Sequence, residues 1–164
     1  MTKKKEEITS DVTPKLPLPS VEKVFKKPSD ILLDAQDKIK QTTGRLCSNW
    51  WNHETQKYEF RMCALGVLGF EAGIRPEHML GDSDIYSDSR HYDEADVAEK
   101  YFSPDDVYMC PVKDCNFTRK VISPNDLSSY IPEPRPLMNL IPHLNDEHYW
   151  SFTRIGEWLK TVNY

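Results

Sequence analysis

The 164-residue sequence lacks any run of the 18 or so apolar residues that a membrane-spanning helix needs. Its first residues, Met-Thr-Lys-Lys-Lys-Glu-Glu, are followed by no apolar segment of the kind found in secretory signal peptides. Basic residues are also scarce, because 21 Lys and Arg stand against 26 Asp and Glu, for a formal net charge of −5. We therefore expect a soluble protein that is not secreted by a signal peptide, does not bind membranes and has no general affinity for nucleic acid.

Cysteine is limited to four residues, and without a signal peptide these are expected to be thiols or metal ligands and not a disulfide framework. The apolar fraction is also low, at 38%. Part of this deficit comes from residues 1–28, which hold seven lysines and four prolines and favour polyproline II over helix or sheet. We predict that residues 1–28 form an extended arm that binds a protein partner, and that residues 29–164 form a single domain.

Hydrophobic patterning predicts helices and a hairpin in the first half of this domain. Ser29 can cap a helix over residues 30–40, and a hairpin turning through residues 54–57 should pack Trp50 or Trp51 into the core. The apolar run over residues 62–72, closed by Gly73, predicts a central buried helix. Gly66 and Gly69 within it should allow another element to approach closely.

The second half is predicted to mix loops, strands and helices. Residues 77–106 hold ten acidic residues and should form a solvated loop region with a short helix over residues 94–101. Residues 107–122 should form two strands joined by a tight turn, followed by a polar link over residues 123–136. Asn139 is expected to cap a helix over residues 140–147, and Ser151 a final helix.

Two thiols and two imidazoles in this half predict a zinc site. Cys110 and Cys115 lie at the turn between the predicted strands, and His143 and His148 lie at the end of a predicted helix. This ligand set and the order strand, turn, strand, helix are typical of a zinc finger, although 27 residues separate Cys115 from His143 where a compact finger has about 12. The alternative is two unconnected thiols and two surface histidines. With four protein ligands the Zn²⁺ would be structural, so the predicted fold class is α+β, with a small helical core and a zinc-stapled ββα-like part over residues 107–164.

The sequence also offers residues for two other functions. Cys63, with His53 or His91 as a base, is a candidate nucleophile for a thiol enzyme, but its apolar neighbours favour an inert buried cysteine. Residues 143–159 could form a helix-turn-helix, whose second helix offers Arg154 and Lys160 for phosphate contact. We therefore assign no catalytic or cofactor-binding residue and expect a protein that is not an enzyme.

Two segments carry a resemblance to a known family. These are Met-Cys-Ala-Leu-Gly-Val-Leu at 62–68, preceded by a tryptophan-bearing hairpin, and His-Leu-Asn-Asp-Glu-His-Tyr-Trp-Ser at 143–151. They resemble a small, uncharacterised family of tailed-bacteriophage and bacterial proteins, over residues 30–73 and 138–162. The resemblance implies a virion or assembly component, or a host-takeover factor in the host cytoplasm, that acts through protein-protein contacts. On physical grounds, Asn145 or Asp146 should bond freed backbone groups at the turn between the helices.

Overall fold

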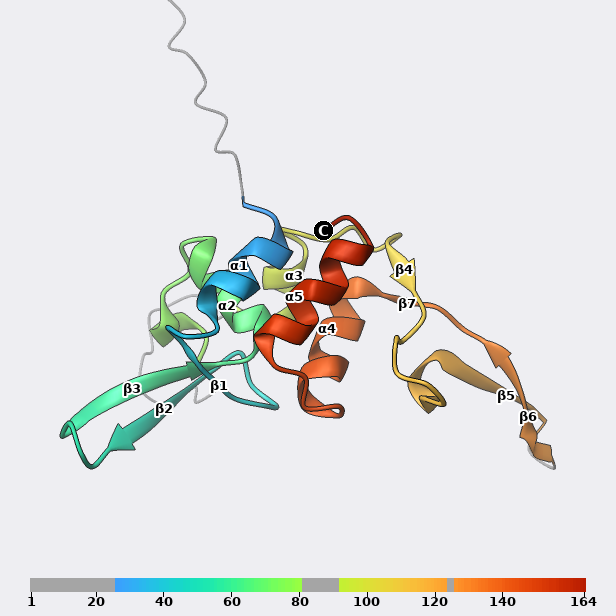
Figure 1. The fold of residues 1–164 in the computed structure, drawn as a ribbon, viewed down its shortest axis with the longest axis horizontal. Helices are drawn as coiled ribbons and strands as arrows, with labels where there is room; N and C mark the ends of the chain where they lie inside the picture. Colours follow the sequence, from blue (N-terminus) through green and yellow to red (C-terminus); the bar gives the residue numbers. More distant parts are fainter. Residues whose placement is uncertain (1–25, 81–91, 124–125) are drawn as a thin grey trace, which may run out of the picture.

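The computed structural model describes residues 26–80, 92–123 and 126–164, and the predicted arm lies outside these ranges except for its last residues. A body of helices occupies the centre of the molecule, and two hairpins project from opposite sides of it (Figure 1). The helices are α1 (Pro28–Ala35), α2 (Ala64–Glu71), α3 (Glu94–Ala98), α4 (Leu137–Asp146) and α5 (Phe152–Thr161), with short 3-10 turns at Pro76–His78 and Asn116–Thr118. The predicted α+β class is confirmed.

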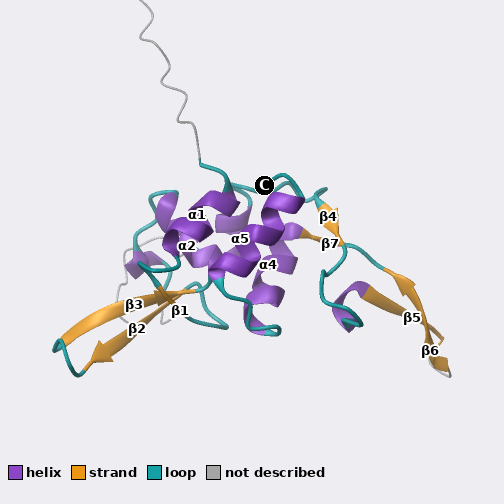
Figure 2. Ribbon diagram, in the orientation of Figure 1, coloured by secondary structure: helices purple, strands orange, loops and turns teal. Residues whose placement is uncertain are grey.

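Short strands form the two projections and one small sheet near the helical body (Figure 2). The strands are β1 (Lys40–Gln41), β2 (Cys47–Asn52), β3 (Lys57–Met62), β4 (Val107–Tyr108), β5 (Arg119–Ser123), β6 (Asp126–Pro132) and β7 (Arg135–Pro136). β3 lies between β1, which is parallel to it, and β2, which is antiparallel. β5 pairs with β6, and β4 pairs with β7.

The first helix differs from its prediction at both ends. It begins at Pro28, a residue suited to the first turn because its missing N–H has no partner there, and Ser29 lies buried inside the helix. It ends at Ala35 because Lys40 and Gln41 pair with Arg61 and Met62 of β3. A long-range strand pairing thus ends the helix before the predicted boundary.

The hairpin is confirmed, but the prediction that Trp50 or Trp51 packs into the core is wrong. Trp50 is 38% exposed and Trp51 half-buried, because the hairpin projects away from the helices. The guanidinium carbon of Arg61 lies 4.3 Å from the centre of the Trp50 ring, and Lys40 Nζ lies 5.2 Å from it. These cations cover the indole in place of a hydrophobic core.

The central apolar helix is confirmed as α2, which begins after Cys63 and is followed by Gly73 with a φ of +89°. Its two glycines have the predicted role. A Cβ on Gly66 would lie 1.8 Å from the backbone oxygen of Leu46, and one on Gly69 would lie 2.9 Å from Met79 Sδ. At Gly66 the backbone therefore passes α2 at a distance that only glycine permits, whereas at Gly69 the close neighbours are the side chains of Met79 and Val97.

The last two helices pack differently from a simple helical hairpin. α5 lies along α1, and its buried residues Phe152, Ile155 and Leu159 belong to the same core as Leu32 of α1. Ser151 caps α5 as predicted, its Oγ accepting a hydrogen bond from Arg154 N at 3.3 Å. α4 begins at Leu137, three residues before its predicted start, so Asn139 lies inside it and is not its cap.

Candidate metal centre

The loop between β4 and β5 places the two thiols. Cys110 is buried and its backbone N–H donates to Thr118 Oγ1 at 3.3 Å, which holds the start of the loop against its end. Asp114 has a φ of +62° and pairs with Arg119 at 2.6 Å, and Cys115 N donates to Val112 O at 3.3 Å. This tight turn brings the second thiol back beside the first.

The prediction that the two strands flanking this loop pair with each other is wrong. β4 pairs with β7 and β5 pairs with β6, so part of the predicted polar link is a strand. The ladder between Arg119 and Pro132 closes the β5–β6 hairpin, and Glu133 N donates to Thr118 O at 2.9 Å. Without the 14 residues from β5 through β6, the spacer between Cys115 and His143 is 13 residues, close to the roughly 12 of a compact finger. The long spacer is thus explained by an inserted hairpin.

The end of α4 places the two histidines. His143 lies in the last turn of the helix, and His148 follows the cap residue Glu147. Tyr149 then has a φ of +52°, and Trp150 N donates to Leu144 O at 3.0 Å. This left-handed residue reverses the chain into α5 and holds His148 beside the helix end.

The four predicted ligands come together in the structure. His148 Nε2 lies 3.6 Å from Cys110 Sγ and 3.3 Å from Cys115 Sγ, and His143 Nε2 lies 3.1 Å from Cys115 Sγ. All four ligand atoms lie within 4.8 Å of one another, close enough to hold a metal ion. Neighbouring ligand atoms around a tetrahedral Zn²⁺ would be about 3.3–3.8 Å apart, given bonds of about 2.3 Å to sulfur and 2.0–2.1 Å to nitrogen. These three sulfur–nitrogen distances are close to that spacing.

Aromatic stacking fixes the ring of His143. Phe117 stacks on it with 4.1 Å between ring centres and an interplanar angle of 12°. Arg135 lies over the Phe117 ring, with its guanidinium carbon 5.7 Å from the ring centre, and its Nε donates to Phe117 O at 3.1 Å. Phe117 and Arg135 flank the β5–β6 hairpin, so the base of the hairpin supports one of the candidate ligands.

The protein environment changes the acidity of two of these ligands. Burial raises the pKa of Cys110 to about 11, and the adjacent Cys115 adds to the increase. Burial also lowers the pKa of His143, with a further contribution from His148. A neutral imidazole is ready to bind a metal ion, whereas the Cys110 thiol needs a cation to become a thiolate. Metal binding here should therefore release a proton.

The other sequence candidates are less favourably placed. Cys63 is 2% exposed, and burial raises its pKa to about 12, so its thiol is protonated and inaccessible at neutral pH. His53 lies exposed on the hairpin, and His91 lies outside the described residues. On α5, Arg154 stacks on the ring of Trp150 at 4.1 Å, and Lys160 pairs with Asp30 at 3.5 Å. Both cations proposed for DNA contact already have partners within the protein.

A buried polar residue that sequence reasoning placed at a local turn has a long-range role. Asn145 is fully buried, and its Oδ1 accepts from Gln41 Nε2 at 2.8 Å and from Ala64 N at 3.2 Å. Its Nδ2 donates to Thr42 O at 2.9 Å. Asn145 thus joins α4 to the first turn of α2 and to the chain after β1. Its position in the 143–151 motif was the available signal, but the distant partners were not predictable.

Comparisons with family models, curated proteins and solved structures found no match for this chain. Within the described part of the chain, no helix is both long and apolar enough to cross a membrane. Among the same residues, the group formed by Cys110, Cys115, His143 and His148 is the candidate metal centre.

Proposed function

We propose that Cys110, Cys115, His143 and His148 bind one structural Zn²⁺. The proximity of these four side chains is the observation that carries the proposal. Two thiolates and two imidazoles suit Zn²⁺ better than Mg²⁺ or Ca²⁺, which prefer oxygen ligands. Four protein ligands leave no position for a reactive water, so the ion would stabilise the fold and not catalyse a reaction.

The ion would connect the β4–β5 loop to the end of α4, in addition to the contacts that Cys110, Val112 and Phe117 make with the core. The β4–β5 loop contributes Cys110 and Thr118 as its buried residues, and Phe117 is half-buried. The segment that follows this loop, from Arg119 to Pro132, projects from the helical body as a hairpin. A bound Zn²⁺ would therefore hold the base of this hairpin against α4. Zinc-finger peptides gain about 10–16 kcal/mol from binding the ion, enough to decide whether such a segment folds.

The test is metal content together with thermal stability. The purified protein should hold one zinc per chain by elemental analysis, and a strong chelator should lower its melting temperature. Cys110→Ser should lose the metal and melt early even without chelator. Cys63→Ser is the matched control, because it changes a buried cysteine outside the site and should keep one zinc per chain. A metal-free protein whose melting is unchanged by chelator would refute the proposal.

The function that we propose for the whole chain is a non-enzymatic one, based on protein-protein contacts in a phage-type setting. It would act in a virion, in virion assembly, or as a host-takeover factor in the host cytoplasm, with the arm over residues 1–28 contacting its partner. Several large apolar side chains on the described surface are exposed and would be available for such contacts: Trp50, Tyr58, Phe70, Val107, Met109, Ile131 and Tyr149.

This wider proposal is tested by cross-linking in the cells that make the protein. Lysine-reactive cross-linkers should join Lys3, Lys4 or Lys5 of the arm to a different protein, which mass spectrometry identifies. Mass spectrometry of purified particles then separates a virion component from an intracellular factor. Cross-links from these lysines to this chain alone would contradict the proposed role of the arm.

A further inference from the structure

The candidate metal centre brings two thiols together within one loop. The Sγ atoms of Cys110 and Cys115 belong to the four ligand atoms that lie within 4.8 Å of one another. The turn at Asp114 returns the chain, so that Cys115 N donates to Val112 O at 3.3 Å. Because a disulfide holds its sulfur atoms about 2.05 Å apart, these two sulfurs need to approach by less than about 3 Å. That distance is on the scale of a side-chain rotation.

The two thiols of the loop differ in exposure. Cys110 is 9% exposed, whereas Cys115 is half-buried and so more open to solvent. A small oxidant such as hydrogen peroxide therefore meets Cys115 first, with Cys110 beside it as a second thiol. In the zinc-bound protein that we propose, both sulfurs are thiolates, which is the form that reacts with peroxides.

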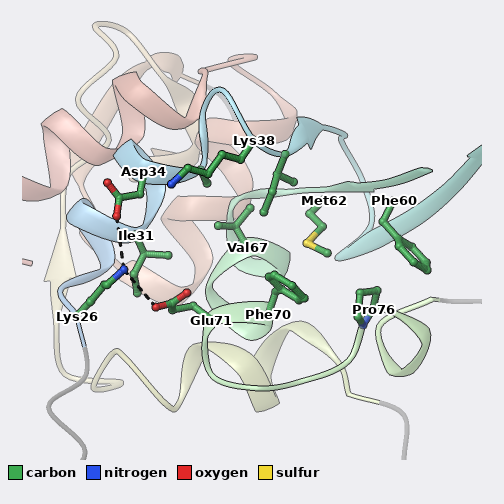
Figure 3. A pocket seen from close by; sticks show the side chains of 12 residues that line it. Lys26, Ile31, Asp34, Lys38, Phe60, Met62, Val67, Phe70, Glu71 and Pro76 are labelled. Atoms are coloured by element: carbon green, nitrogen blue, oxygen red, sulfur yellow. Dashed lines mark hydrogen bonds and ion pairs between the residues drawn. The ribbon is translucent and has the colours of Figure 1, made fainter. Parts of the chain in front are cut away.

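The other two cysteines are closed to such an oxidant. Cys47 is 0% exposed and Cys63 is 2% exposed. Met62 and Val67, on either side of Cys63 in the sequence, line a groove of about 460 Å³ between α1, α2 and β3 (Figure 3), but Cys63 is not among its lining residues. The groove thus gives no access to this thiol, and oxidation of Cys47 or Cys63 needs an opening of the fold.

We propose that Cys110 and Cys115 are a peroxide-sensitive pair, whose oxidation to a disulfide releases the metal ion. This inference rests on the proposed zinc site and adds its regulation. The Cys115 thiolate attacks one oxygen of hydrogen peroxide and breaks the O–O bond, giving a sulfenic acid and a hydroxide. The Cys110 thiolate then attacks Cys115 Sγ, so that the S–S bond forms and the S–O bond breaks with loss of a second hydroxide. Each hydroxide takes a proton from solvent, so one peroxide and two protons become two waters as two thiolates become one disulfide.

Oxidation would remove the tie between the loop and α4. Two of the four ligands of the ion come from the loop, and His143 and His148 come from the end of α4. The disulfide joins only the two loop residues, so it does not replace the connection to α4. The stack of Phe117 on His143 involves no sulfur and is not broken by the reaction itself. Peroxide should therefore lower the melting temperature toward that of the chelated protein.

The experiment treats the zinc-loaded, full-length protein with hydrogen peroxide, after its zinc content has been measured. A colorimetric zinc indicator follows release, and mass spectrometry of alkylated tryptic peptides locates the disulfide. Trypsin cuts after Lys113, between the two cysteines, so the disulfide links peptide 101–113 to peptide 114–119. We expect one zinc released for each disulfide formed. Cys110 and Cys115 should oxidise at least about tenfold faster than Cys47 or Cys63, because reactivity follows thiolate character and exposure.

Cys63→Ser is the matched control, because a serine hydroxyl can still accept from Gly66 N, which lies 3.4 Å from Cys63 Sγ. This variant should release zinc at the rate of the unchanged protein. Protein that holds one zinc per chain and keeps it at a peroxide concentration that oxidises free cysteine would overturn this inference and leave the zinc site standing. Zinc release without the linked peptides would overturn it too. Protein without zinc before treatment would refute the proposed function, and this inference with it.

Discussion

Asn145→Ala should destabilise the fold by removing a hydrogen-bonding centre between distant segments. The substitution leaves the buried Ala64 N–H without its side-chain partner and takes a donor from Thr42 O. Gln41 Nε2 keeps its bond to Trp150 O at 2.7 Å. Each buried polar group left unpaired costs about 1–3 kcal/mol, so we expect a loss of about 3 kcal/mol. That is a large part of the 5–15 kcal/mol typical of a domain.

Urea denaturation followed by circular dichroism measures this loss, with metal content held constant. Asn139→Ala is the matched control, since Asn139 lies on the same helix but is exposed, and its effect should stay within about 0.5 kcal/mol. A double substitution with Gln41→Ala should cost less than the sum of the single changes, because the two side chains are bonded to each other. A loss below about 1 kcal/mol for Asn145→Ala would refute this account of the residue.

Three further predictions concern helix ends and buried acids. Ser151→Ala should lower the free energy of unfolding, measured by urea denaturation, by about 1 kcal/mol because it removes the cap of α5. Ser29→Ala should leave this free energy unchanged, since Ser29 Oγ has no hydrogen-bond partner among the described residues. Equal losses in the two variants would contradict this. Cys63 should resist iodoacetamide at pH 7 in the folded protein, because a pKa of about 12 leaves roughly 10⁻⁵ of it as thiolate, and rapid labelling would reopen the thiol-enzyme hypothesis. Burial raises the pKa of Glu94, helped by Asp146 and Asp93, so the folded state holds this proton more tightly than the unfolded state. Glu94→Gln should therefore stabilise the protein at pH 7, with the gain fading as pH falls below the raised pKa toward 4.5; a loss at pH 7 would contradict this.

Features that depend on neighbouring residues were predictable from the sequence. Ser151 caps α5 through the N–H three residues later, and Gly73 follows α2 because a left-handed residue is favoured there. The end of α1 was not predictable in this way. Its helical pattern continues past Ala35, but Lys40 and Gln41 are taken up by the distant strand β3. Local preference was overridden by a pairing that no local pattern encodes.

The candidate metal centre shows the same division. Cys110, Cys115, His143 and His148 could be singled out because thiols and imidazoles at these spacings are an uncommon and chemically specific set. The pairing of β4 with β7 could not be predicted, since two-residue strands leave almost no pattern in the sequence. Nor could the stacking of Phe117 on His143, which are far apart in the sequence.

The sequence by itself determined the types of candidate ligand, the apolar faces of the main helices and the glycines at close contacts, because residue chemistry and periodicity are local properties. Only the tertiary structure decided that the ligands meet. The ladder that closes the β5–β6 hairpin at Arg119 and Pro132 brings the two ends of a long spacer together. Asn145, through its bonds to Ala64 and Thr42, places α4 where His143 reaches Cys115. The bonds of Asn145 join residues 81 and 103 positions apart, so they form only when distant parts of the chain have folded together.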